Sequence, residues 1–407
     1  MTTTMRDARV DRLLGDALAA ARRPARQQPQ WCDAGRLAEA RTRLSIAEPI
    51  VGDDTVRQLA GLLARAADGE FCVLQAGDCA EDPAECGLDD IRPKVELLDL
   101  LADIMRVGAD ASVLTVGRIA GQYAKPRSSD HEVRDGVRLP VYRGSIVNGP
   151  APSPTARRAD PERMLLGHVS ARRAVAAIDT LGRGAGCEPE RRVWTSHEAL
   201  LLDYEVPQVR PTTDGRVYLA STHWPWIGER TRQVDGAHVR LLSLVDNPVG
   251  CKVGPTMTVD ELLELCAVLD PHRTPGRLTL ISRFGAAHID RLGPLVRAVR
   301  RAGHPVLWMC DPMHGNTIVG DHGLKTRRLH DVMAEINRFV AVVGANGGTS
   351  AGLHLEASAA DVSECEGAGV VVQRGEHYRT LCDPRLNTTQ AVAAVAHWHR
   401  ERMAVAA

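Results

Sequence analysis

Apolar residues gather in eight short runs along the chain, and each run ends in charged, polar or glycine residues. The runs span residues 71–79, 112–118, 192–198, 217–223, 249–254, 278–285, 304–312 and 351–356. Runs of this length that are rich in Val, Ile and Leu are typical of strands buried on both faces. Helical patterns cover 94–108 and 288–303, and we expect a long surface helix between 151 and 191. Eight such strands with intervening helices predict an α/β fold, a closed (β/α)8 TIM barrel.

Side chains that can do chemistry stand where the predicted strands end. They are Asp78, Cys79, Arg118, His197, Glu198, His223, Lys252, Arg283, Asp311, His314 and Glu356. Because the functional groups of such barrels lie at the carboxyl ends of the strands, we expect these side chains to share one face of the molecule.

The chain of 407 residues has no internal repeat or change of composition that would divide it. A short amphipathic helix is expected in the Arg- and Ala-rich stretch 9–28. We therefore predict a short N-terminal extension, residues 1–60, that packs on a catalytic barrel formed by residues 61–407.

Charge and cysteine usage narrow the class of protein. Fifty basic and fifty-one acidic residues give a formal net charge of −1, so no overall field favours nucleic acid or an anionic membrane. No apolar run approaches the roughly 20 residues of a membrane helix, and the first thirty residues lack a secretory pattern. Ten cysteines without a C-x-x-C pair favour a reducing, cytoplasmic location over a disulfide framework.

Cationic side chains recur at the predicted strand ends and predict anion binding. The segment "RIAGQYAKPRSSD" places Arg118, Lys125 and Arg127 within ten residues. Arginine makes planar two-point contacts with carboxylate or phosphate, and lysine adds a point charge. Taken alone, this segment fits a solvated basic loop equally well. Together with Lys252 and Arg283, it predicts one or two substrates that carry phosphate and carboxylate groups.

A soft thiolate, an imidazole and two carboxylates form a candidate metal site. These ligands are Cys79, His314, Glu356 and Asp383, and the mixed set suits a borderline divalent ion. Each residue alone also fits a structural role. Cys382 precedes Asp383, and a barrel that brings it beside Cys79 would allow a disulfide under oxidation; a small buried residue is the alternative.

Ten motifs closely resemble the type II family of 3-deoxy-D-arabino-heptulosonate-7-phosphate (DAHP) synthases, in the order of that family from about residue 28 to residue 395. The motifs are "LQAGDCAE", "GRIAGQYAKPRS", "YRGSIVNG", "SHEALLLDYE", "WIGERTRQVDGAH", "NPVGCKVGPTMT", "SRFGAAHIDRL", "CDPMHGNT", "ECEGAG" and "CDPRLNTTQ".

The resemblance implies a (β/α)8 barrel and a 3-deoxy-7-phosphoheptulonate synthase, a transferase. Such an enzyme condenses phosphoenolpyruvate with erythrose 4-phosphate to give DAHP and phosphate, the first step of the shikimate route to aromatic amino acids. It also implies one divalent metal ion on Cys79, His314, Glu356 and Asp383. Mn²⁺ or Co²⁺ is expected first, with Fe²⁺ and Zn²⁺ as alternatives.

The resemblance also assigns roles to individual residues. Those implied for phosphoenolpyruvate are Arg118, Lys125, Trp226, Glu229, Arg230, Lys252 and Arg283. Those implied for erythrose 4-phosphate are Lys125, Arg127 and Ser128. For catalysis, including the protons of the attacking water, the candidates are Lys125, Glu198 and Glu229, with His197 as a further one.

The connection between residues 149 and 196 is short, whereas longer family members carry a helical insertion there that serves subunit contacts and feedback binding of aromatic amino acids. The short form resembles members dedicated to secondary metabolism, of the phenazine type, so we expect weak feedback regulation. A homo-oligomer, a dimer or tetramer, is implied by resemblance. Two alternatives stay open: an amino-DAHP synthase that takes a nitrogen-bearing acceptor, and a catalytically silent barrel that binds another pathway enzyme.

Overall fold

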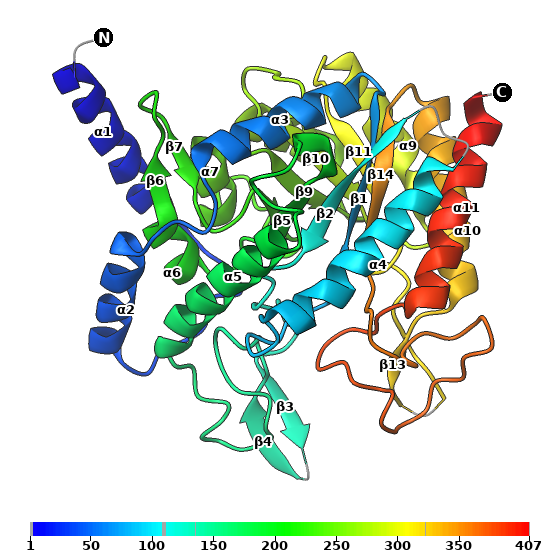
Figure 1. The fold of residues 1–407 in the computed structure, drawn as a ribbon, viewed down its shortest axis with the longest axis horizontal. Helices are drawn as coiled ribbons and strands as arrows, with labels where there is room; N and C mark the ends of the chain where they lie inside the picture. The colour runs from blue at the N-terminus through cyan, green and yellow to red at the C-terminus, as the bar shows by residue number, and fades with distance from the viewer. Residues whose placement is uncertain (1–2, 108–110, 135, 322, 407) are drawn as a thin grey trace.

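A closed barrel of eight parallel strands forms the centre of the molecule (Figure 1). The computed structural model describes residues 3–107, 111–134, 136–321 and 323–406. Around the barrel the strands run in the order β1-β14-β11-β10-β9-β8-β5-β2. Their bounds are β1 Phe71–Gly77, β2 Ser112–Arg118, β5 Val193–Glu198, β8 Trp224–Ile227, β9 Val249–Val253, β10 Leu278–Ser282, β11 Leu307–Cys310 and β14 Ser350–Glu356. The expected (β/α)8 fold is confirmed.

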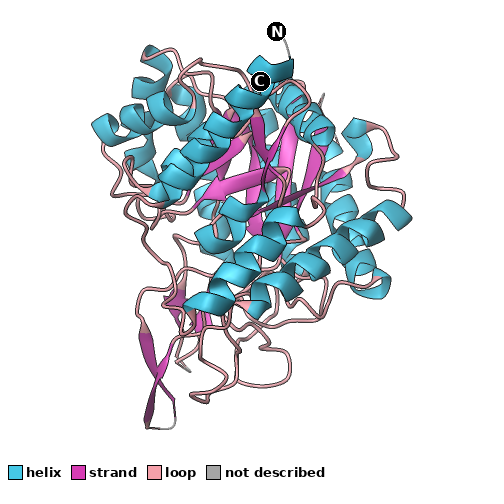
Figure 2. Ribbon diagram, turned by 90° about the vertical axis from the view of Figure 1, so that its left-hand side faces the viewer, coloured by secondary structure: helices cyan, strands magenta, loops and turns pink. Residues whose placement is uncertain are grey.

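Helices surround the strands on the outside of the barrel (Figure 2). The helices of this ring are α4 Leu88–Arg106, α5 Glu162–Thr180, α7 Ala237–Leu244, α8 Val259–Leu269, α9 Leu292–Arg301, α10 Leu329–Ala345 and α11 Thr388–Ala406. Helix α11 contacts both α10 and α4, so the last helix of the chain closes the ring beside the first. The helices expected at 94–108 and 288–303 correspond to α4 and to α9 with the short 3-10 turn Ile289–Arg291 before it; residue 108 lies outside the described residues.

Helix α3 (Asp53–Ala67) covers the amino-terminal end of the barrel. Its Leu59 and Leu63 pack with Phe71, Trp194 and Trp224, which stand at or next to the first positions of their strands. Before it, α1 (Thr3–Ala21) packs on α7, and α2 (Ala34–Ile46) packs on α5. The domain boundary at residue 60 stays a prediction, and residue 60 lies within α3.

Two hairpins extend from the opposite, carboxyl-terminal end of the barrel. The first joins β3 (His131–Arg134) to β4 (Val137–Pro140), and the second joins β12 (Ile318–Val319) to β13 (Lys325–Thr326). Both lie at the lower end of the molecule in Figure 1, away from α3. Long connections therefore gather at the carboxyl ends of the strands, where a barrel can hold a site.

The fourth barrel strand differs from the sequence prediction. The apolar pattern predicts it at 217–223, but Val217–Leu219 is β7, which pairs antiparallel with β6 (Val209–Pro211) outside the barrel. Short turns of helix, Leu202–Glu205 and Val206–Gln208, precede this hairpin. The barrel strand is Trp224–Ile227, and its Pro225 weakens the strand pattern because proline donates no ladder hydrogen bond. The segments 217–219 and 224–227 are both buried and apolar and lie close together in the sequence. Apolar character alone does not show which of them is the barrel strand.

His223 consequently lies at the start of its strand, at the opposite end from the site we predicted for it. Its ring is buried, and Nδ1 lies 2.8 Å from Thr195 Oγ1. Burial lowers the pKa of His223 to about 3, so the ring is neutral and takes a structural place beneath the barrel.

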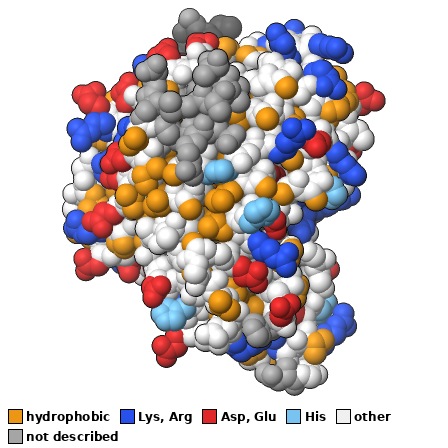
Figure 3. Space-filling view, turned by 90° about the vertical axis from the view of Figure 1, so that its right-hand side faces the viewer, with side chains coloured by type: hydrophobic (Ala, Val, Ile, Leu, Met, Phe, Trp, Pro, Cys, Tyr) orange, Lys and Arg blue, Asp and Glu red, His pale blue; other side chains and the backbone are white. Residues whose placement is uncertain are grey.

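The surface carries both signs of charge. On the face shown in Figure 3, basic and acidic side chains both lie around a group of hydrophobic side chains, and basic ones predominate at the upper right. None of the helices in the described parts of the chain is long and apolar enough to cross a membrane.

A pair of glycine substitutions tests the strand register. A Cβ at Gly352 of β14 would lie 1.9 Å from the Val73 carbonyl oxygen of β1, so Gly352→Ala should lower the free energy of unfolding by at least about 2 kcal/mol. In contrast, Gly61 on the exposed side of α3 has open space around it, and Gly61→Ala should raise stability by about 0.5–1 kcal/mol. Denaturant unfolding measures both. A Gly352→Ala protein as stable as the wild type would contradict the β1–β14 pairing.

Candidate active site

Three of the four predicted metal ligands form one cluster at the carboxyl end of the barrel. Cys79 follows β1, Glu356 ends β14, and Asp383 lies in the loop before α11. Their ligand atoms all lie within 4.8 Å of one another. The fourth, His314, places Nε2 3.3 Å from Glu356 Oε1. Segments far apart in sequence thus bring the predicted thiolate, imidazole and carboxylates together.

The ammonium group of Lys125 lies inside this cluster. Its Nζ is 2.8 Å from Cys79 Sγ, 3.3 Å from Glu356 Oε1 and 3.1 Å from Asp383 Oδ2. Burial alone would lower the pKa of Lys125, but these neighbours outweigh it and raise the pKa well above its usual value. The donor set therefore stabilises positive charge at its centre, which is the property that a divalent cation requires.

Cys382 lies beside Cys79, as one of our two readings requires. Both thiols belong to a small buried cluster with Tyr142, and none of the ten cysteines, all within the described residues, forms a disulfide. The hydrogen bond from Cys79 lowers the pKa of Cys382, whereas burial raises the pKa of Cys79.

The turn after β11 orients His314. Asp311 Oδ2 accepts hydrogen bonds from His314 Nδ1 at 2.7 Å and from Lys252 Nζ at 2.5 Å. Asp311 Oδ1 accepts from the backbone N–H groups of Met313 and His314. Because Nδ1 is engaged by the carboxylate, Nε2 is the nitrogen that faces Glu356, the arrangement that metal-binding histidines usually have.

A buried glutamate supports the same turn from behind. Glu335 of α10 accepts from the N–H groups of Phe284 and Gly285 and from Asn316 Nδ2, the last at 2.8 Å. Burial raises the pKa of Glu335 to about 8. Glu335 and Asn316 together therefore join the turn after β11 to the loop after β10, and Arg283 is the first residue of that loop.

A cavity of about 320 Å³ opens beside the cluster and brings together most of the predicted substrate residues. The predicted residues that line it are Arg118, Lys125, Arg127, Ser128, Glu198, Trp226, Glu229, Arg230, Lys252, Arg283, His314 and Asp383. With Lys325 included, seven cations and four carboxylates face this space. An excess of positive charge in a partly enclosed cavity attracts anions.

Two buried cations flank the Trp226 ring at the base of the cavity. The Arg118 guanidinium lies 5.1 Å from the ring centroid, and Lys252 Nζ lies 6.0 Å from it. Burial lowers the pKa of Lys252 to about 8 even though Asp311 opposes that shift. Both positive groups therefore lie close to the indole, where one anion can contact both of them.

A hydrogen-bond chain through the barrel interior fixes Arg118, and sequence reasoning missed it. Arg118 Nη1 lies 2.6 Å from His354 Nε2, and His354 Nδ1 lies 2.6 Å from Gln75 Oε1. Burial lowers the pKa of His354 well below its usual value, so the neutral ring accepts from Arg118 and donates to Gln75. Gln75 in turn donates to Ser196 Oγ at 3.0 Å. These polar residues stand inside apolar runs, which concealed them.

Arg327 and Lys325 were also missed in the sequence. Arg327 Nη2 lies 2.8 Å from Glu356 Oε2, and both side chains are fully buried. Lys325 Nζ donates to Asp383 Oδ1 at 2.8 Å. Both cations come from the β12–β13 hairpin region, which has no apolar run to mark it.

The acid–base candidates Glu198, Glu229 and His197 have different surroundings in the structure. Glu198 lines the cavity, its Oε1 has no hydrogen-bond partner among the described residues, and burial raises its pKa. Glu229 lines the cavity but pairs with Arg232 at 2.9 Å. The His197 ring instead pairs with buried Glu205 at 2.9 Å, and His197 is not among the described residues that line the cavity.

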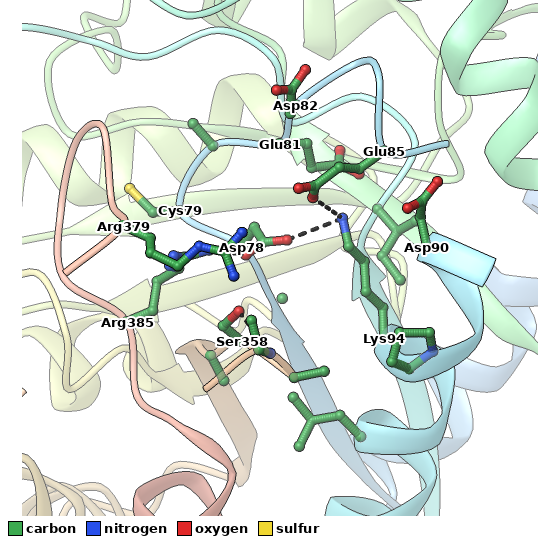
Figure 4. Close-up of a pocket in the computed structure, with 18 of the residues that line it drawn as sticks. Asp78, Cys79, Glu81, Asp82, Glu85, Asp90, Lys94, Ser358, Arg379 and Arg385 are labelled. Carbon is green, nitrogen blue, oxygen red and sulfur yellow. Dashed lines mark hydrogen bonds and ion pairs between the residues drawn. The ribbon is translucent and has the colours of Figure 1, made fainter. Parts of the chain in front are cut away.

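A larger cavity of about 450 Å³ lies on the other side of Cys79 (Figure 4). Six carboxylates and three cations line it, and two of these cations are engaged with carboxylates. Lys94 lies 3.1 Å from Asp78, and Arg385 lies 2.6 Å from Asp78 while it also binds Glu364. This acidic space does not suit anionic substrates, so the smaller cavity is the candidate active site.

A (β/α)8 barrel with a cation-lined cavity and a thiol–carboxylate cluster at its carboxyl end defines a class of barrel enzymes that act on anionic substrates. Within that class, the chain belongs to the class-II DAHP synthetase family, whose sequence profile matches residues 17–188 and 185–397. The resemblance noted from the motifs is thereby confirmed.

Three relatives extend over most of the chain. A probable phospho-2-dehydro-3-deoxyheptonate aldolase of Pseudomonas fluorescens is 50% identical over 381 residues, which cover 91% of this chain and 94% of the relative. Phospho-2-dehydro-3-deoxyheptonate aldolase of Streptomyces coelicolor is 40% identical (91% and 93% covered). The AroG enzyme of that name from Mycolicibacterium smegmatis is 37% identical (93% and 92% covered).

Among solved structures, phospho-2-dehydro-3-deoxyheptonate aldolase from Francisella tularensis superposes with a TM-score of 0.52. The superposition covers 90% of this chain and 97% of the other, at 14% sequence identity. At that identity the likeness shows the barrel fold alone.

The Asp311 carboxylate provides a test of the cluster. Because it fixes Nδ1 of His314, Asp311→Asn should weaken Co²⁺ binding about 10- to 100-fold, measured by competition with a chelator. Asp331→Asn is the matched control, since that carboxylate contacts the exposed His330 at 3.2 Å. Equal Co²⁺ affinity in the two variants would contradict the proposed role of Asp311.

Proposed function

We propose that this chain is a DAHP synthase that joins phosphoenolpyruvate to erythrose 4-phosphate with a divalent metal ion. The observation that carries the proposal is the junction of a cavity lined by seven cations with the cluster around Cys79 and Glu356. Both substrates are phosphorylated, and one also carries a carboxylate. The names of the relatives support the same reaction.

Phosphoenolpyruvate fits the inner part of the cavity. Arg118, Lys252 and Arg283 offer fixed positive groups to its carboxylate and phosphate, and Trp226 supplies an apolar wall beside them. A clamp of this kind holds the methylene carbon of the substrate in one orientation and removes much of the entropy cost of the reaction. Arg230 lies farther out in the same cavity.

The acceptor phosphate fits the outer part. Arg127 and Ser128 line the cavity next to Arg230, whose Nη2 donates to Ser128 Oγ at 2.9 Å. An acceptor held there by its phosphate directs its aldehyde inward, toward Lys125 and the cluster. Discrimination between the aldose and a nitrogen-bearing acceptor then depends on the space between these two ends.

Cys79, His314, Glu356 and Asp383 would hold the metal ion, and the mixed donor set favours Mn²⁺ or Co²⁺, with Fe²⁺ or Zn²⁺ as alternatives. A bound ion supplies Lewis acidity that polarises the acceptor carbonyl. Lys125 contacts three of these ligands and also faces the cavity, so its ammonium can donate a hydrogen bond to the carbonyl oxygen and stabilise the negative charge that builds there as the new carbon–carbon bond forms.

Water completes the reaction by adding to C2 of the former phosphoenolpyruvate, after which phosphate leaves. Two observations support Glu198 as the base that accepts a proton from this water. Its buried carboxyl has a raised pKa, and its Oε1 has no hydrogen-bond partner among the described residues. Gly228 leaves room for this side chain, since a Cβ there would lie 2.0 Å from Glu198 Oε1.

A role in secondary metabolism with weak feedback regulation is part of the proposal. One long helix, α5, occupies the connection between β4 and β5. The alignment with the Mycolicibacterium relative spans 434 residues, which is more than the 407 residues of this chain. The Mycolicibacterium protein therefore carries segments that have no counterpart in this chain. Ten cysteines without a C-x-x-C pair support a reducing compartment such as the cytoplasm. We also propose a homo-oligomer.

Phosphate release and loss of phosphoenolpyruvate test the reaction directly. With erythrose 4-phosphate and Mn²⁺ or Co²⁺ we expect steady turnover that excess chelator abolishes. Arg283→Gln should raise KM for phosphoenolpyruvate about 10- to 100-fold through loss of a charged contact, whereas Arg297→Gln on the exposed face of α9 should not. Folded, reduced, metal-loaded protein without turnover would refute the proposal and favour a nitrogen-bearing acceptor or a silent partner role.

A further inference from the structure

The linker between α1 and α2 lies at the mouth of the candidate active site and is fixed to the barrel. Pro24 O accepts a hydrogen bond from the Ala237 N–H at 3.1 Å. Gln28 Nε2 donates to Leu200 O at 2.9 Å, and Gln28 Oε1 accepts from the Leu202 N–H at 3.0 Å. The backbone is thus held on both sides of Gln27.

Gln27 has an unusual backbone and a specific contact. Its φ of 65° lies in the left-handed region that non-glycine residues rarely adopt. Its side-chain Oε1 accepts a hydrogen bond from the Arg127 N–H at 2.8 Å, across 100 residues of sequence. A strained residue persists where its surroundings fix it, and such residues concentrate at functional sites.

The contact of Gln27 falls on the segment that carries the proposed acceptor-phosphate ligands. The Lys125 N–H donates to Arg143 O at 2.9 Å, so this segment is anchored at Lys125 by the loop after β4 and at Arg127 by the linker. Arg26 and Gln27 also line a space that shares Arg127, Ser128 and Arg230 with the active-site cavity.

We propose that Gln27 is a positioning residue that holds Arg127 and Ser128 for the phosphate of the acceptor substrate. The inference rests on the proposed function, because it takes these two residues as the acceptor-phosphate ligands. The Gln27 amide binds the backbone of Arg127 and leaves the guanidinium and the Ser128 hydroxyl directed to the cavity. The N-terminal segment thereby contributes to acceptor recognition from outside the barrel.

Gln27→Gly separates this role from a structural one. Glycine adopts a φ of 65° without strain, so the variant loses the acceptor for the Arg127 N–H while the linker keeps its path. We expect KM for erythrose 4-phosphate to rise about fivefold to tenfold, the usual effect of one lost hydrogen bond. KM for phosphoenolpyruvate and kcat should change less than about twofold. The melting temperature should change by no more than a few degrees.

Gln28→Ala is the matched control in the full-length, metal-loaded protein. It removes the neighbouring glutamine, which binds Leu200 and Leu202 but not Arg127, so it should lower the melting temperature without a selective change in KM for the acceptor. Wild-type turnover in the same assay tests the proposed function first. If the wild type turns over and Gln27→Gly changes both KM values equally, changes neither, or behaves like Gln28→Ala, the role of Gln27 is refuted and the reaction is not.

Discussion

A buried carboxylate that needs positive charge around it governs the carboxyl end of this barrel. Glu356 is fully buried, and Arg118, Lys125, Arg327 and His314 all approach its two oxygens within 3.3 Å. Burial would raise the pKa of Glu356, yet these neighbours hold it well below its usual value. An unpaired charge in such a place would cost several kcal/mol, of order 3–5, so each cation is fixed by the same carboxylate that it neutralises.

This charge balance explains why the site is assembled from so many strands. Glu356 ends β14 between β1 and β11, so the Cys79 loop and the His314 turn reach it from the two neighbouring strands. Arg118 arrives from β2, one strand farther, and is steadied from within the barrel by His354. Loops that carry cations then close over the end, and the same positive groups that satisfy Glu356 face the cavity in which anions would bind.

The sequence predicted those parts of the fold and of the site that depend on a local pattern of apolar and polar residues. Apolar runs and the side chains after them located most barrel strands and placed Cys79, His314 and Glu356 together, because parallel strands bring their carboxyl ends together. Asp383 lies in the loop before α11 and follows no such run. The strand with Pro225 was misplaced because its local signal is weak. His354 and Gln27 contact partners 279 and 100 residues away, and Arg327 lies in an irregular segment between β13 and α10. These positions carry no periodic signal that pattern reading could detect.

We propose that the Glu356 cluster binds a divalent ion through the Cys79 thiolate, at the place that the Lys125 ammonium occupies in this structure. Titration of reduced protein with Co²⁺, followed by near-ultraviolet absorption, tests it most directly, because thiolate coordination gives a charge-transfer band that oxygen and nitrogen ligands do not. We predict a band that saturates at one ion per chain and is lost in Cys79→Ser. Co²⁺ that binds without the band, or a band that persists in Cys79→Ser, would contradict the account.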